Sequence, residues 1–147
     1  MKCRNYHLNS LKMIRNIEQV RAKKAYGFVN EIKRDFQEEN AKKYKSYVKK
    51  LPMLIKSYGL GAALSYALQK GKNDKDNAWG RLYNQINEWI RENKSFLLGD
   101  NPPDDLAAVV ISRNSSEYRA LTIEIISLLT WVRRFAEGLI EGEPDVD

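Results

Sequence analysis

The side chains best suited to chemistry in this chain are lysines and arginines that recur at helical spacing in its first third. Residues 1–56 carry fifteen basic and five acidic residues, a formal charge of +10, whereas residues 57–147 carry ten basic and fourteen acidic residues, or −4. Basic side chains spaced three and four residues apart gather on one face of a helix. Such a face neutralises the phosphates of a polyanion without reading its sequence. The charge pattern therefore favours nucleic-acid binding.

Catalytic and metal-binding groups are scarce by count. Cys3 is the only cysteine and His7 the only histidine, which excludes zinc sites, Cys–His nucleophiles and an intramolecular disulfide. The glycines Gly59 and Gly61 are followed by no Lys-Ser/Thr pair, so they form no phosphate-binding loop. We therefore predict that the protein is not an enzyme, holds no metal or cofactor and takes no small-molecule substrate.

The carboxylates offer a weaker alternative. Glu117 and Glu124 lie seven residues apart on one helix face, but acid–base or metal chemistry would need carboxylates that converge from different helices. Helix capping explains Asp104, and the favourable helix dipole explains Glu117. Glu124 is flanked by apolar residues, and we expect it to be the buried partner of Arg21 or Arg119. Arg21 interrupts the apolar stripe of the first predicted helix, which favours a buried ion pair.

The elements that must position these residues are helices, because apolar residues recur with a period of 3.6. The first predicted helix begins at Leu11 and ends at a break at residues 38–40. Five further helices are predicted, at 44–58, Leu60 to Gln69, 79–90, Leu106 to Ile111, and 118–139. Pro52 is expected to kink or restart the second helix, and Gly71 to end the third. Asp104 is the expected N-cap of the fifth helix, and Ser115 or Ser116 that of the last.

No strand-like alternation with hairpin turns is present. We predict an all-α, single-domain bundle of five to six helices with a long amphipathic N-terminal helix. The helical domain is expected to span residues 13–142, between an N-terminal extension at 1–12, which we expect to be mobile, and an acidic tail at 143–147. No stretch approaches the roughly 18 apolar residues that span a membrane, and no signal peptide is recognisable. We therefore expect a cytoplasmic protein without a membrane partner.

Ten basic residues are the candidates for phosphate contact. They are Lys12, Arg15 and Lys23 on the first helix, Lys42, Lys45, Lys49, Lys50 and Lys56 on the second, and, as second choices, Arg133 and Arg134 on the last. Tyr26, Tyr44 and Tyr47 lie near the basic rows, where tyrosines can stack on bases. Tyr44 and Tyr47 also lie on the apolar stripe, so we expect them to pack in the core.

Three segments together resemble a known family. They are residues 19–26, residues 51–72 with Leu51-Pro52 followed by Gly59-Leu60-Gly61, and residues 117–142 with the run from Trp131 to Gly138. In order and spacing they resemble the small α-helical subunit of the Cmr (type III-B) CRISPR RNA-targeting complex. The resemblance spans roughly residues 15–142, and residues 1–12 have no counterpart in it.

The resemblance implies a non-catalytic structural subunit of an antiviral ribonucleoprotein. Such subunits stack with copies of themselves and with other Cmr subunits along the guide RNA–target RNA duplex, and contact the RNA backbone through basic patches. Sequence would then be read by guide–target pairing, and the protein would read backbone and shape. The resemblance also allows Arg133 and Arg134 to pair with acids instead. The alternative from the charge pattern is a helical adaptor whose basic face binds an acidic protein.

Overall fold

Six α-helices and one short 3₁₀ helix make up the part of the chain that the structure describes. The computed structural model describes residues 2–72 and 77–144, and only the backbone of residues 2–15. The helices are α1 (Lys2–Asp35), α2 (Glu38–Tyr58), α3 (Leu60–Gly71), α4 (Ala78–Asn93), η1 (Ser95–Leu98), α5 (Leu106–Ser112) and α6 (Ser115–Leu139). Within these ranges no residue forms a strand. The prediction of an all-α bundle is confirmed.

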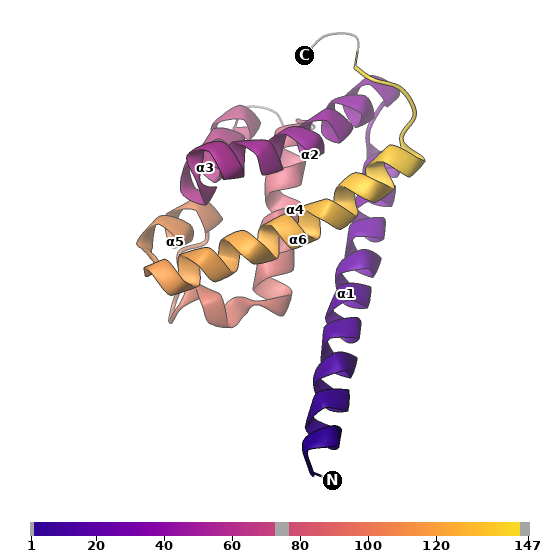
Figure 1. Ribbon diagram of the computed structural model, residues 1–147. Coiled ribbons are helices and arrows are strands. Elements are labelled where there is room, and N and C mark those ends of the chain that lie inside the picture. The colour runs from indigo at the N-terminus through magenta and orange to yellow at the C-terminus, as the bar shows by residue number, and fades with distance from the viewer. Residues whose placement is uncertain (1, 73–76, 145–147) are drawn as a thin grey trace.

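Helix α1 is the longest element, and much of it lies outside the body of the bundle. It begins at Lys2, well before Leu11, so the backbone of residues 2–12 is helical and continuous with the rest of α1. Its C-terminal half packs against α6, while its N-terminal half extends below the other helices (Figure 1). The chain leaves the helix at Phe36 and Gln37, just before the break expected at residues 38–40.

The α2–α3 corner depends on small residues. Helix α2 continues through Pro52, so this proline does not restart the helix as one of the two expectations had it. Gly59 joins the two helices with φ +90°, a left-handed conformation that favours glycine. Further along, a Cβ on Gly71 would lie 2.5 Å from the Cα of Gly80, so these two glycines let α3 and α4 approach closely.

Two predicted N-caps were wrong by one residue. The side chain of Asp105, and not Asp104, accepts a hydrogen bond from the amide of Ala107 and caps α5. Asn114, and not Ser115 or Ser116, caps α6 by accepting from the amide of Glu117. Asp and Asn accept these bonds as well as Ser does, so several adjacent cap residues cannot be ranked from residue type alone.

A polar network crosses the core between α1, α4 and α6. Glu124 is only 5 % exposed and accepts two hydrogen bonds from Arg21, at 2.9 and 2.7 Å. The indole of Trp89 donates a third at 2.9 Å. Arg21 also pairs with Glu18, whose other oxygen accepts from the indole of Trp131. The buried pairing of Glu124 is confirmed, with Arg21 as the partner.

Candidate nucleic-acid interface

The α2–α3 hairpin carries a stretch of chain without any acid. Residues 41–72 contain eight lysines and no aspartate or glutamate. These lysines are Lys42, Lys43, Lys45, Lys49, Lys50, Lys56, Lys70 and Lys72. Because α2 and α3 pack against each other, the stretch forms one positively charged unit whose neutralisation depends on other elements.

The C-terminal segment supplies that neutralisation on one side of α2. After α6, Ile140 and Glu143 both lie beside α2, and the chain turns between them at Gly142, which has φ +80°. Lys45 is only 4 % exposed, and its ammonium donates to the carbonyl of Ile140 at 3.0 Å. This bond ties α2 to the end of α6 and uses one of the three N–H groups of the ammonium. Burial disfavours contact between Lys45 and RNA, and that contact stays a prediction.

Two other predicted residues share this side. Lys49 pairs with Glu137 and Glu143, at 2.5 and 3.2 Å. The hydrogen bond between Lys49 and Glu137 raises the pKa of the lysine and lowers that of the glutamate. Lys42 pairs with Glu38 at 3.4 Å. Both lysines are only partly exposed, so an RNA phosphate would have to compete with an intramolecular carboxylate for each.

The other lysines of the hairpin have no such partner. Lys50, Lys56, Lys70 and Lys72 are exposed and Lys43 is half-buried, and none pairs with an acid among residues 16–72 and 77–144. Lys50 and Lys56 were among the predicted contacts. Lys43, Lys70 and Lys72 were not, although the absence of acids between residues 41 and 72 was a signal visible in the sequence.

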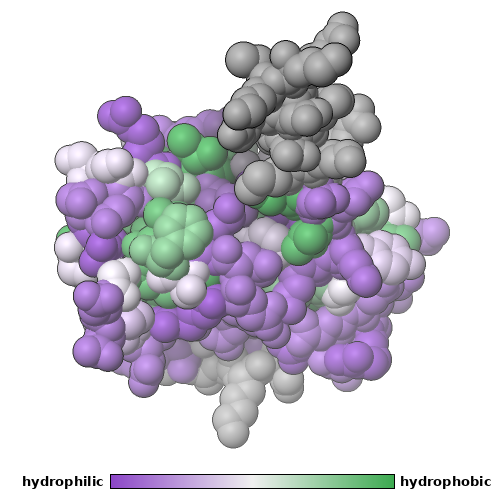
Figure 2. Space-filling model, turned by 90° about the horizontal axis from the view of Figure 1, so that it is seen from below, coloured by the Kyte–Doolittle hydropathy of each residue, from purple (hydrophilic) through white to green (hydrophobic). Residues whose placement is uncertain are grey.

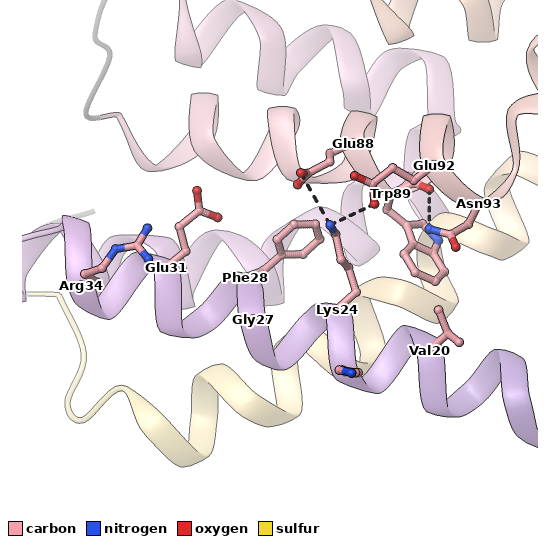
Figure 3. Close-up of a pocket in the computed structure, with 11 residues that line it drawn as sticks. Val20, Lys24, Gly27, Phe28, Glu31, Arg34, Glu88, Trp89, Glu92 and Asn93 are labelled. Atoms are coloured by element: carbon pink, nitrogen blue, oxygen red, sulfur yellow. Dashed lines mark hydrogen bonds and ion pairs between the residues drawn. The ribbon is translucent and has the colours of Figure 1, made fainter.

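The candidates on α1 lie apart from the hairpin. Lys23 is exposed and makes no ion pair with the described residues. It borders a groove of about 690 Å³ between α1 and α4, where Lys24 reaches across to Glu88 and Glu92 at 3.5 and 3.0 Å (Figure 3). Acids and bases alternate along this groove, so it is not a continuous cationic surface. The side chains of Lys12 and Arg15, like those of Cys3 and His7, lie outside the described residues.

The two arginines of α6 are exposed near its contact with α1. Arg134 lies over the ring of Trp131, with 5.0 Å between its guanidinium carbon and the ring centroid. Neither Arg134 nor Arg133 forms an ion pair within the described part of the chain. They therefore remain candidates, in an area separate from the α2–α3 lysines.

Seen from below, the surface is mainly polar and its apolar groups form separate patches (Figure 2).

The tyrosines divide as their sequence positions suggested. Tyr44 is fully buried, and its hydroxyl donates to Gln85. Tyr47 stacks on Trp79 with 4.4 Å between ring centroids. Core packing of both is thus confirmed. Tyr26 is half exposed and meets Phe135 edge-on, so its outer surface remains accessible.

The carboxylates do not assemble into a reactive group in the described part of the chain. No cluster of three or more His, Cys, Asp or Glu side chains suited to a metal occurs there. Burial alone would raise the pKa of Glu124, but the hydrogen bonds from Arg21 and Trp89 outweigh it and hold that pKa below its ordinary value. An ionised carboxylate paired in this way is a structural group. None of the described helices is long and apolar enough to span a bilayer.

Comparison with known proteins identifies the family of this chain. The family model described as CRISPR-associated protein (Cas_Cmr5) matches residues 17–139. The chain belongs to the Cmr5 family of CRISPR-associated proteins. A relative from Thermus thermophilus, named CRISPR system Cmr subunit Cmr5, is 30% identical over 128 residues, which is 87% of this chain and 99% of that protein.

A solved structure supports the same assignment. The crystal structure of a CRISPR-associated Cmr5 family protein, also from Thermus thermophilus, matches with a TM-score of 0.64 and 28% identity, over 84% of this chain and 97% of that one. The matched segment begins at residue 17, so the long N-terminal part of α1 lies outside the family model. The resemblance inferred from the sequence is confirmed at the level of family and fold.

Proposed function

We propose that this protein is a non-catalytic structural subunit of a type III-B Cmr complex and that it contacts the backbone of guide and target RNA through the α2–α3 hairpin. Its partners are the other Cmr subunits and copies of itself. Family membership supports the assignment to the complex. The observation that carries the RNA contact is the group of five lysines on an acid-free hairpin that no described carboxylate neutralises.

The physical basis is counter-ion release. Each ammonium that meets a phosphate displaces a condensed cation, so the logarithm of the affinity falls with that of the salt concentration. The slope for single strands is about −0.7 per phosphate neutralised, so five engaged lysines would give roughly −3.5. Such contacts carry no sequence information, as expected where base pairing between two RNAs does the reading.

The decisive experiment compares two charge reversals of equal size. One variant carries Lys50→Glu and Lys56→Glu, both exposed and unpaired on the hairpin. The matched control carries Lys33→Glu and Arg119→Glu, which are exposed on α1 and α6. Binding of a labelled single-stranded RNA is measured by fluorescence anisotropy at several salt concentrations. We expect the hairpin variant to lose at least about tenfold in affinity and to show a shallower salt slope, and the control to lose about twofold.

Equal losses in both variants would mean that only net charge matters and would refute the hairpin as the RNA surface. Each variant is also incorporated into the reconstituted complex, which reports assembly separately from RNA affinity. The alternative function, an adaptor that binds an acidic protein, is tested with a polyglutamate competitor of equal charge. Stronger binding of polyglutamate than of RNA would favour the adaptor.

A further inference from the structure

A groove between α2 and α3 has the composition of a base-binding site. It encloses about 370 Å³ and is bordered by Lys50, Leu54, Tyr58, Ala62, Ala63 and Tyr66. Its floor is small and apolar, and tyrosines from both helices line it. Tyr58 is 73 % exposed and has no partner ring among the described residues. The groove thus offers an aromatic surface that the described side chains leave exposed.

Two cations lie near the Tyr66 ring at the edge of this groove, and one of them, Lys50, borders the groove itself. The ammonium groups of Lys50 and Lys70 each lie 5.6 Å from the centroid of the Tyr66 ring. They are therefore within twice that distance of each other, and neither pairs with a described acid. Two ammonium groups near one ring, with no described acid paired to either, form a locally positive area that attracts an anion. The site is complementary to a ligand that combines a flat ring with a phosphate.

The ring of Tyr66 is already fixed in place. It meets Trp79 edge-on, with 5.4 Å between centroids and an interplanar angle of 86°. Trp79 is in turn stacked on Tyr47. These ring contacts hold Tyr66 in place before any ligand binds. Binding therefore costs conformational entropy only for Tyr58 and the lysine side chains.

We propose that this groove binds one unpaired nucleobase of an RNA strand, stacked against the exposed face of Tyr58, with the adjoining phosphate between Lys50 and Lys70. The inference rests on the proposed function and adds to it a contact that requires a base outside a duplex. Stacking accepts any base because every base has a π-face, which suits a protein that does not read sequence. A paired base cannot enter, since both of its faces are covered in the helix.

The test uses two RNAs that differ at one position. Both carry a single unpaired nucleotide between two duplex segments, and in one RNA that nucleotide lacks its base. Tyr58→Ala removes the stacking surface, and Tyr58→Phe is the matched control. Ala62→Leu fills the groove from an exposed position without changing charge. Affinity for each RNA is measured with the full-length protein and with every variant.

We expect the wild-type protein and Tyr58→Phe to prefer the RNA with the base by at least about fivefold. Tyr58→Ala and Ala62→Leu should lose that preference while keeping their affinity for the abasic RNA. Lys50→Gln should weaken binding of both RNAs. Equal affinity of the wild-type protein for the two RNAs would overturn the base site and leave backbone binding intact.

Two further outcomes are informative. Unchanged affinity for both RNAs in the Lys50→Glu, Lys56→Glu variant would refute the proposed function itself, so the two failures are distinguishable. A second arm measures binding to an acidic peptide and to anionic vesicles, because the exposed Met53 lies nearby on α2. Tyr58-dependent binding of either one, without a base preference in RNA, would assign the groove to another occupant and overturn the proposal.

Discussion

Replacing Glu124 by Gln should destabilise the protein, because it removes a buried negative charge that accepts three hydrogen bonds. Arg21 donates two hydrogen bonds to Glu124 and Trp89 donates a third, all between 2.7 and 2.9 Å. The amide of Gln is nearly the same size as the carboxyl group and can still accept from Trp89. It cannot accept both hydrogen bonds from Arg21, so the guanidinium, which is 12 % exposed, loses its main counter-charge.

The magnitude follows from what remains around Arg21. Removing one partner of a buried ion pair typically costs about 3–5 kcal/mol, because an uncompensated charge is left behind. Arg21 keeps its contact with Glu18, whose side chain is partly exposed, so the loss should lie near the lower end, at about 3 kcal/mol. For a chain of this length that loss lowers Tm by about 6–12 °C.

Urea unfolding followed by circular dichroism measures the loss directly, and tryptophan fluorescence follows the surroundings of Trp89. The control is Arg34→Gln, which breaks an exposed pair with Asp35 and should change stability far less than Glu124→Gln does. The double variant Arg21→Met, Glu124→Gln should recover part of the loss, because it removes the unpaired guanidinium and keeps an acceptor for the Trp89 indole. A loss below about 1 kcal/mol, or a double variant no more stable than Glu124→Gln alone, would refute the reasoning.

Three smaller changes test other contacts. Gly27→Ala should stabilise the protein by about 0.5–1 kcal/mol in urea unfolding, because a Cβ there meets no atom within 4 Å and alanine favours the helix; a loss of stability would show that α1 does not pack as described. Hydrogen bonds from Arg34 and Arg81 lower the pKa of Asp35 to about 2. The ionised carboxylate therefore stabilises the fold fully above its unfolded-state pKa of 3.8, and this stabilisation disappears as the pH falls towards 2. The stability difference between the wild-type protein and Asp35→Asn should therefore shrink between about pH 6 and about pH 2, and a constant difference would contradict this pairing. Glu137→Gln combined with Glu143→Gln should raise RNA affinity severalfold by releasing Lys49, measured by anisotropy, whereas unchanged affinity would mean that this lysine does not reach RNA.

Helical periodicity was sufficient for the fold because each helix has one face in the core. The stripe through Leu121, Ile125, Leu128 and Val132 is buried as its spacing required. Helix ends were less predictable, since several adjacent residues can each act as a cap. The start of α1 was missed because residues 2–10 have no apolar stripe, and no other element packs against that part of the helix in Figure 1.

The site was harder to predict because a helical wheel gives a face but not what covers it. Lys42, Lys45 and Lys49 share a face, and the sequence suggested that solvent or RNA would lie against it. Lys45 instead meets the carbonyl of Ile140, a residue 95 positions away, which no local pattern encodes. Arg21 could be identified as buried for the opposite reason, because a charge within an apolar stripe must find a partner.

The distribution of charge acquires a different meaning once the chain is folded. The excess of +10 in residues 1–56 suggested one broad basic surface, but acids from distant segments neutralise part of it. Glu137 and Glu143 cover one side of α2, while Glu88 and Glu92 meet Lys24 on α1. Among the described residues, none covers the outer side of the α2–α3 hairpin with an acid, and the sequence from residue 41 to residue 72 contains no acid. Local absence of acids, more than local excess of lysines, therefore identifies the surface on which a polyanion would meet the least competition.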